Sequence, residues 1–336
     1  MKRKVKIMLP FRYKMIAIQL LLIGTFIISI VYGAANIRVI DVWLSLASNA
    51  EGSDISVIRE IRLPREVAAV FVGAALSIAG AMMQGMTRNP LADPGLLGLT
   101  AGANAALAIA IVLLPSLNYF GIMVTCFLGA AIGASMVFGI SAVKRGGFST
   151  FKIVLAGAAV SAFLQAICEG IGIYFKVSKD VSMWTAGGLI GTTWGQLQII
   201  VPFIAVSMLI GFALSSQLTI LSLNEEVSIG LGQKTGQIKA ILFVIIILLV
   251  GASVALVGNI AFIGLMVPHI VRAIVGTDYR YILPMSAFVG AILMLVADTI
   301  ARTINAPWET PIVSIISVMG LPFFLLIMRK GGRIFT

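Results

Sequence analysis

The sequence predicts an all-α, polytopic membrane protein with about ten transmembrane helices. Of its 336 residues, 60% are hydrophobic and only 11% are charged, and the mean hydropathy is +1.07. A soluble protein of this length could not hide so much apolar surface, because a large part of any folded surface stays in contact with water. Several apolar runs of about 18 residues or more match the hydrocarbon core of a bilayer, which is about 30 Å thick.

Ten apolar segments make up the predicted bundle. The first has no small-residue cleavage pattern, so we expect a retained helix rather than a signal peptide. Because the number is even, both termini are expected on the same side of the membrane. A basic N-terminal segment, 1–14, and the bundle, 15–329, form one predicted domain over 1–336. The predicted spans are 15–34, 67–86, 95–115, 120–142, 151–173, 197–214, 239–258, 260–276, 281–302 and 311–329.

The distribution of charge predicts that both termini are cytoplasmic. With the N-terminus inside, the inner segments carry 17 Lys and Arg residues against four acids, and the outer side carries seven against nine. The net charges, +13 inside and −2 outside, together give the formal charge of +11. Since Lys and Arg prefer the cytoplasmic side, this orientation is strongly favoured. Much of the basic excess therefore follows from the membrane topology, so no nucleic-acid partner is expected.

Two arginines go against this charge distribution. Arg62 and Arg65 bracket a proline in "RLPRE", directly before the uncharged run 67–86, and the predicted orientation places them outside. Charged side chains at the rim of a bilayer often anchor a helix in the interface. From the residues alone, anchoring is the favoured interpretation, and a role in binding a partner stays open.

No catalytic set, metal site or cofactor site is predicted. His269, the sole histidine, has no His, Cys or carboxylate three or four positions away, so a hydrogen-bonded structural role is favoured over metal binding or proton relay. The glycine-rich stretch 230–237 departs from the P-loop pattern, and no strand precedes it. Cys126 and Cys168 lie inside apolar runs and are expected to be buried without a disulfide. The chain is therefore expected to take its energy from elsewhere.

Two other classes of function are weighed against this expectation. An ion-coupled secondary transporter, which would act without an ATPase, generally needs ionisable groups at mid-membrane depth. Glu169 and Asp298 are the only acids within the predicted spans, and both lie toward outer ends, where Asp298 and Arg302 have the i, i+4 spacing of a local ion pair. A membrane-embedded enzyme would need a polar catalytic set inside the spans. The ion-coupled transporter remains the main alternative.

Four segments resemble the iron-siderophore/cobalamin (FecCD-type) permease family, the membrane subunits of type II ABC importers. They read "RLPREVAAVFVGAALSIAGAMMQGMTRNPLADPGLLGLTAGA", "GNIAFIGLMVPHIVRAIVGTDYRYILP", "ADTIAR" and "ETPIVSIISVMGLPFFLLIMRK". The resemblance covers nearly the whole chain beyond the first helix. It implies ten helices per subunit, the number reached from hydropathy. It also implies a transport subunit rather than an enzyme.

The resemblance implies several partners and a docking surface. Two permease subunits would form the pathway, ATP-binding cassette subunits would dock on the cytoplasmic side, and an extracytoplasmic binding protein would deliver the ligand. The arginines of the R-L-P-R motif and one near the end of the ninth helix would face acidic residues of that binding protein. Here these are Arg62, Arg65 and Arg302. Guanidinium groups suit such carboxylates because they bind them through two parallel hydrogen bonds.

The resemblance also implies a cytoplasmic gate. In "RNPLADPG", Asn89 and Leu91 match gate positions, and Thr150 in "FSTF" matches another. The family often has a small polar residue after that threonine, whereas this chain has Phe151. From the residues alone, Asn89 is equally compatible with capping a helix.

A third implied site couples the permease to the ATPase. The segment 218–239 resembles the short helices that fit a groove in the ATPase subunit, with Glu225, Glu226 and Gly230 at the matching positions. Acids at a helix N-terminus complement the helix dipole.

The expected ligand is a ferric siderophore or a related metal chelate. Siderophore, haem and cobalamin permeases share the motifs quoted above, and siderophores are favoured only because iron permeases are the most numerous. Whether the second permease is an identical copy or a paralogue stays open.

Overall fold

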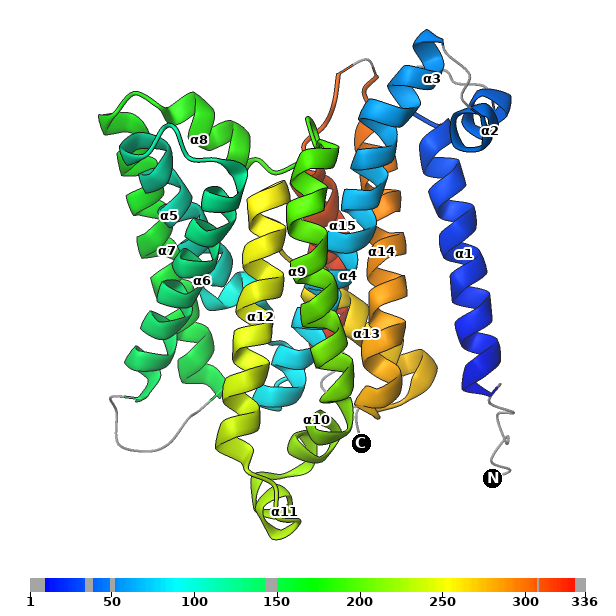
Figure 1. Cartoon of the computed structure of the whole chain (residues 1–336). Coiled ribbons are helices and arrows are strands. Elements are labelled where there is room, and N and C mark those ends of the chain that lie inside the picture. The colour runs from blue at the N-terminus through cyan, green and yellow to red at the C-terminus, as the bar shows by residue number, and fades with distance from the viewer. Residues whose placement is uncertain (1–9, 34–38, 49–51, 143–149, 307, 330–336) are drawn as a thin grey trace.

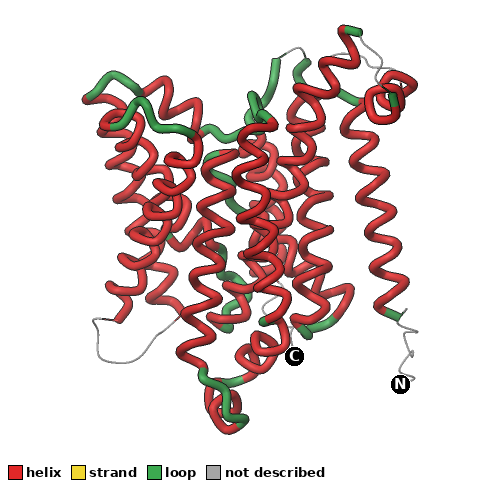
Figure 2. Tube along the Cα trace, viewed as in Figure 1, coloured by secondary structure: helices red, strands yellow, loops and turns green. Residues whose placement is uncertain are grey.

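The computed structural model describes residues 10–33, 39–48, 52–142, 150–306 and 308–329. Within these ranges every regular element is a helix, which confirms the predicted all-α class (Figures 1 and 2). The long helices stand side by side, and short helices cover the two ends of the bundle (Figure 1).

Each of the ten predicted spans coincides with one helix, with ends that differ by at most four residues. Of the described helices, seven are long and apolar enough to cross a membrane, whereas α5, α13 and α15 are apolar but shorter. The number of ten crossings therefore stays a prediction. The helices are α1 (Phe11–Val31), α4 (Leu63–Thr87), α5 (Leu99–Leu113), α6 (Tyr119–Ala142), α7 (Thr150–Tyr174), α9 (Trp194–Ala213), α12 (Thr235–Val257), α13 (Ile263–Val275), α14 (Tyr279–Thr303) and α15 (Ile312–Arg329).

Short helices lie at both ends of the bundle. At the upper end of Figure 1 are α2, α3 and α8, and at the lower end are α10 and α11. Helix α11 lies within the segment 218–239, for which short helices were expected, and α10 overlaps the start of that segment. The bounds are α2 (Val39–Ala47), α3 (Ser53–Val57), the π-helix η1 (Ile58–Arg62), the 3-10 helix η2 (Pro94–Leu97), α8 (Ser178–Thr185), α10 (Ser215–Leu223) and α11 (Glu225–Gly230).

Helix α4 forms the centre of the bundle, where it packs against α12, α13 and α14 and buries most of its side chains. Glycines let it approach two of these neighbours very closely. A Cβ atom at Gly80 would lie 2.1 Å from the carbonyl oxygen of Gly264 in α13, and one at Gly73 would lie 2.3 Å from that of Gly290 in α14. Because small residues allow backbones to touch, these contacts fix where α4 crosses both helices.

Helix α1 lies at the side of the bundle, and most of its residues are partly or fully exposed (Figure 1). Such an apolar surface suits contact with lipid. Near its start, Lys14 Nζ donates a hydrogen bond of 2.6 Å to the carbonyl of Ile274, and the ring of Phe11 lies 4.5 Å from that of Tyr281. Near its end, Ser29 enters a polar cluster at the upper end of the molecule.

Candidate functional site

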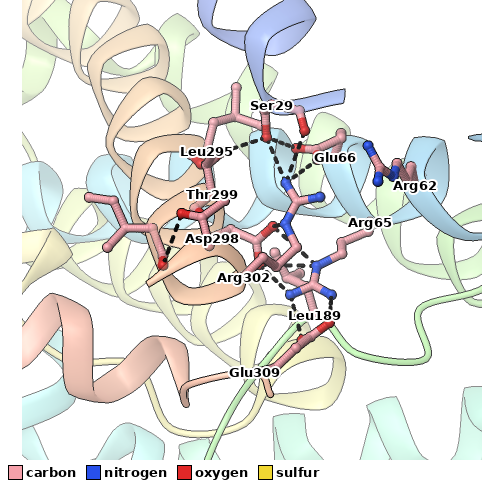
Figure 3. Close-up of polar contacts among 12 residues, drawn as sticks. Ser29, Arg62, Arg65, Glu66, Leu189, Leu295, Asp298, Thr299, Arg302 and Glu309 are labelled. Carbon is pink, nitrogen blue, oxygen red and sulfur yellow. Dashed lines mark hydrogen bonds and ion pairs between the residues drawn. The ribbon is translucent and has the colours of Figure 1, made fainter. Parts of the chain in front are cut away.

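The three arginines with a predicted docking role lie close together at one end of the bundle (Figure 3). Arg62 ends η1, Arg65 lies in the first turn of α4, and Arg302 lies in the last turn of α14. Their exposed fractions are only 6%, 7% and 4%. The chain itself surrounds their guanidinium groups, and the docking role of the three arginines stays a prediction.

Arg65 bridges two carboxylates. Its Nε donates to both carboxylate oxygens of Asp298 at 3.1 Å, and its Nη2 donates to Asp298 Oδ1 at 2.8 Å. On the other edge of the guanidinium, Nη1 and Nη2 donate to the two oxygens of Glu309 at 2.8 and 2.9 Å. Paired hydrogen bonds of this kind are among the strongest that a side chain makes.

Arg302 joins helices α1, α4 and α14. Its Nη2 lies 2.5 Å from Glu66 Oε1 and also donates to the hydroxyl and the carbonyl of Ser29 at 2.9 and 3.2 Å. Its Nε lies 3.0 Å from Asp298 Oδ2, which confirms the i, i+4 pair predicted from the sequence. The Ser29 hydroxyl in turn donates to Glu66 Oε2 at 2.5 Å. Glu66 lies just before the predicted span 67–86, but α4 begins at Leu63, so Glu66 joins Glu169 and Asp298 as an acid inside a long helix.

Arg62 forms hydrogen bonds with the C-terminal end of α1. Its Nη1 donates to the carbonyls of Ile30 and Val31 at 2.5 and 3.0 Å. These carbonyls lie in the last turn of α1, which has no further turn to satisfy them, and a cation there also complements the helix dipole. Two of the predicted docking arginines, Arg62 and Arg302, therefore also hold the end of α1 in place.

We refer to the three arginines and their three acids as the arginine cluster. Its formal charges balance, and within it Asp298 and Glu66 are fully buried, while the side chain of Glu309 is 28% exposed. Glu66 and Glu309 were missed as site residues, although both lie in segments that carry the family resemblance, "RLPRE" and "ETPIV". The cluster consists of Arg62, Arg65, Glu66, Asp298, Arg302 and Glu309.

A cavity of about 550 Å³ borders the cluster at the carboxylate of Glu309. Residues of α8, of the connection between α8 and α9, and of the end of α12 line it. Among the described residues that line it, the charged ones are the acids Asp180 and Glu309. Its wall also includes the indole of Trp184 and the polar side chains of Thr192 and Gln196. Glu309 is therefore the residue that the cluster and the cavity share.

The predicted gate residues lie in the break between α4 and η2. Helix α4 ends at Thr87, and the next residue, Arg88, adopts a left-handed conformation with φ of 51°. The Asn89 side chain accepts a hydrogen bond from the backbone N–H of Leu91 at 3.0 Å, so it stabilises the turn that follows the helix rather than an N-terminal cap. Thr150 begins α7, but its side chain lies outside the described part of the structure. The gate role of all three residues stays a prediction.

The predicted coupling residues lie on α11, which projects from the lower end of the molecule (Figure 1). Asn224 caps this helix by accepting from the N–H of Glu226 at 3.4 Å. Glu226 and Gly230 are exposed, whereas the side chain of Glu225 lies outside the described residues. Three apolar side chains in and after α11 are also exposed, namely Val227, Ile229 and Leu231.

Hydrogen bonds connect this projecting helix to the bundle. Ser228 of α11 donates to the carbonyl of Ile220 in α10 at 3.0 Å. Thr219 of α10 donates to Asp278 at 3.0 Å and accepts from the N–H of Tyr279 at 2.9 Å, at the start of α14. A hydrogen bond from Arg280 holds the pKa of the Asp278 carboxyl below its ordinary value. These hydrogen bonds join α11 through α10 to the start of α14, whose far end carries Asp298 and Arg302.

The remaining candidate side chains, His269, Cys126 and Cys168, are all buried. His269 is buried, and its Nδ1 lies 2.8 Å from the carbonyl oxygen of Leu265, which confirms that it is hydrogen-bonded. Cys126 and Cys168 are both free and buried, as predicted. In the described part of the chain, no group of three His, Cys, Asp or Glu side chains is arranged to hold a metal ion.

Known proteins resemble this chain over most of its length. It is 43% identical over 315 residues to the iron(3+)-hydroxamate import system permease protein FhuB of Bacillus subtilis. The matched region covers 94% of this chain and 82% of that protein. It is 39% identical over 309 residues to the iron-uptake system permease protein FeuB of the same organism, covering 91% and 92%. A metal-chelate type ABC transporter in an inward-facing conformation superposes with a TM-score of 0.81 at 27% identity, covering 95% of this chain and 99% of the other.

The family assignment rests on a match that spans both the sites and the bundle. The model of the FecCD transport family matches residues 20–330, a range that contains the arginine cluster, the α4–η2 break and α11. The resemblance inferred from the quoted motifs is confirmed. The chain belongs to the FecCD transport family.

Proposed function

We propose that this chain is the membrane permease subunit of an ABC importer that takes up ferric siderophores, with ferric hydroxamates as the first candidates. The similarity to an iron(3+)-hydroxamate permease over 94% of the chain carries this proposal. The chain would provide the passage, and a separate ATPase chain would hydrolyse ATP. No cofactor is required of this subunit.

In this proposal the protein crosses the bacterial plasma membrane ten times, with both termini in the cytoplasm. The upper end in Figure 1, with the arginine cluster and the cavity, then faces outward, and α11 faces the cytoplasm. The excess of Lys and Arg on the predicted inner segments supports this orientation.

The proposed cycle starts at the arginine cluster and ends at α11. A loaded binding protein would dock through carboxylates near Arg62, Arg65 and Arg302, and ATP-driven movement of the ATPase would act on α11. The hydrogen bonds through Thr219 and Asp278 offer a route from α11 to α14. The turn at Asn89 and Leu91, together with Thr150, would then switch the side to which the passage opens. A second permease, identical or paralogous, would complete the passage.

Uptake measurements test this function. Cells that lack their own siderophore permeases would express this chain with its ATPase and binding protein, and would receive radioactive iron as a hydroxamate, a catecholate, a citrate or a haem complex. We expect ATPase-dependent uptake of the hydroxamate complex. A matched strain with an inactive ATPase should show none. Uptake that persists in that strain and stops when the proton gradient is collapsed would instead support an ion-coupled transporter.

A further inference from the structure

The guanidinium group of Arg65 has two carboxylate partners that differ sharply in their surroundings. Asp298 lies within α14, is fully buried, and also pairs with Arg302 at 3.0 Å. Glu309 lies between α14 and α15, and its side chain is 28% exposed and lines the cavity. Figure 3 shows Glu309 on the opposite side of Arg65 from Glu66 and Arg302. Only one of the two partners can therefore be reached from outside the protein.

We propose that Glu309 is an exchangeable partner of Arg65, which a carboxylate of the docking binding protein replaces. This inference rests on the proposed docking of a binding protein at the arginine cluster. Asp298 would stay bound through Nε and Nη2 and keep Arg65 oriented. The edge formed by Nη1 and Nη2 now donates to both oxygens of Glu309. It would donate to the two oxygens of the incoming carboxylate with the same paired geometry.

Charge and burial explain why exchange is favoured over simple addition. The three arginines of the cluster are balanced by three carboxylates, so an extra buried carboxylate would have no cation of its own. Burying an unpaired charge is costly, whereas exchange keeps each guanidinium paired. Glu309 is the more exposed of the two partners, 28% against 0% for Asp298, so its released carboxylate can be hydrated and its release costs less than that of Asp298.

The exchange also connects docking to the cavity. Once released from Arg65, the Glu309 carboxylate would be left at the cavity wall, together with Asp180. Arrival of the binding protein would therefore make the cavity more negative. In this way the release of Glu309 would link docking of the binding protein to the charge of the cavity.

The first test measures the affinity of the importer's own loaded binding protein for the complete complex in lipid nanodiscs. With Glu309→Gln, the incoming carboxylate has no competitor, so we expect binding about two- to fivefold tighter, the size associated with a partly exposed ion pair. The matched control is Glu60→Gln. It removes one exposed acid from η1 at the same end of the molecule, and we expect no such gain. Equal gains in both variants would indicate a general charge effect and overturn the exchange.

The double variant Arg65→Gln/Glu309→Gln separates this inference from the docking proposal. It removes the pair together, which leaves Asp298 with Arg302, and it should bind more weakly than the wild type. If the double variant binds weakly but Glu309→Gln gives no gain, docking on Arg65 stands and the exchange fails. If the double variant binds as tightly as Glu309→Gln, docking on Arg65 itself fails.

A fluorescent label gives a measurement that does not depend on affinity. Trp308 is next to Glu309 and is 74% exposed, whereas the native cysteines are buried, so Trp308→Cys can be labelled selectively. We expect the emission of an environment-sensitive dye there to change when the binding protein docks. With Glu309→Gln added, the emission should already be shifted before docking. An emission that never changes on docking would contradict the release of Glu309.

Discussion

Asp298 is the residue on which the arginine cluster depends most. Its carboxylate is fully buried and pairs with Arg65 at 2.8 Å and with Arg302 at 3.0 Å. Neither arginine can turn to water, because both are almost completely buried. A buried ion pair is not by itself a strong source of stability, but losing one partner leaves a charge without compensation.

We predict that Asp298→Asn strongly destabilises the protein. The neutral amide cannot compensate two buried guanidinium groups, and the loss of a buried partner typically costs about 3–5 kcal/mol. Thermal unfolding of the purified protein should show a clear decrease in Tm. Asp180→Asn, which removes an exposed acid at the same end of the molecule, should change stability by about 0.5 kcal/mol at most. Similar Tm values for the two variants would refute the central role of Asp298.

The contacts of Arg65 and Arg302 show what the sequence could predict at this scale. The pair of Asp298 and Arg302 follows from i, i+4 spacing on one helix and was expected. Arg65 and Glu309 are 244 positions apart, and Arg302 and Glu66 are 236 apart. No periodicity connects residues at such distances, so the burial of the arginines became visible only once α1, α4 and α14 were packed together.

At the scale of elements, α11 differs from the long helices in where it exposes its apolar side chains. The long helices expose apolar side chains where lipid can cover them. Helix α11 lies beyond the lower ends of the long helices, yet Val227 and Ile229 are 46% and 59% exposed (Figure 1). Apolar side chains grouped in such a position typically mark a protein interaction site.

We predict that Ile229→Asp uncouples the permease from its ATPase. A carboxylate in an apolar contact would lose its hydration without gaining a partner, so the ATPase should bind at least about tenfold more weakly. Co-purification of the ATPase with tagged permease measures this loss. The matched control, Ile304→Asp, changes an isoleucine of similar exposure directly after α14, at the other end of the molecule from α11, and should retain the ATPase. Normal co-purification of the Ile229→Asp variant would contradict the coupling role of α11.

Hydropathy predicted the long helices well because lipid-spanning helices need long apolar runs, whatever they pack against. It did not define the short ones. Helices α2 and α8 have only 9 and 8 residues and lie at the upper end, where polar and apolar residues mix. The start of α4 was also placed too late, because Arg65 and Glu66 look like rim residues when their burial partners are unknown.

At the scale of the whole molecule, the two ends carry different kinds of site. The arginine cluster and the cavity lie at the upper end of Figure 1, and α11 lies at the lower end. Helix α14 runs between them, with Asp278 hydrogen-bonded to α10 at its start and Arg302 in its last turn. An importer powered from one side and loaded from the other requires such a connection, and the proposed orientation decides which end meets which partner.

We predict that cysteine labelling in cells will place α3 outside and the start of α12 inside. Ser56 of α3 and Gln237 of α12 are exposed at opposite ends of the molecule, and the native Cys126 and Cys168 are buried, so the background should be low. A membrane-impermeant maleimide should label Ser56→Cys in intact cells. It should label Gln237→Cys only after the membrane is permeabilised, because the positive charge near that helix start favours the cytoplasm. The reverse pattern would invert the topology and place the arginine cluster out of reach of any external binding protein.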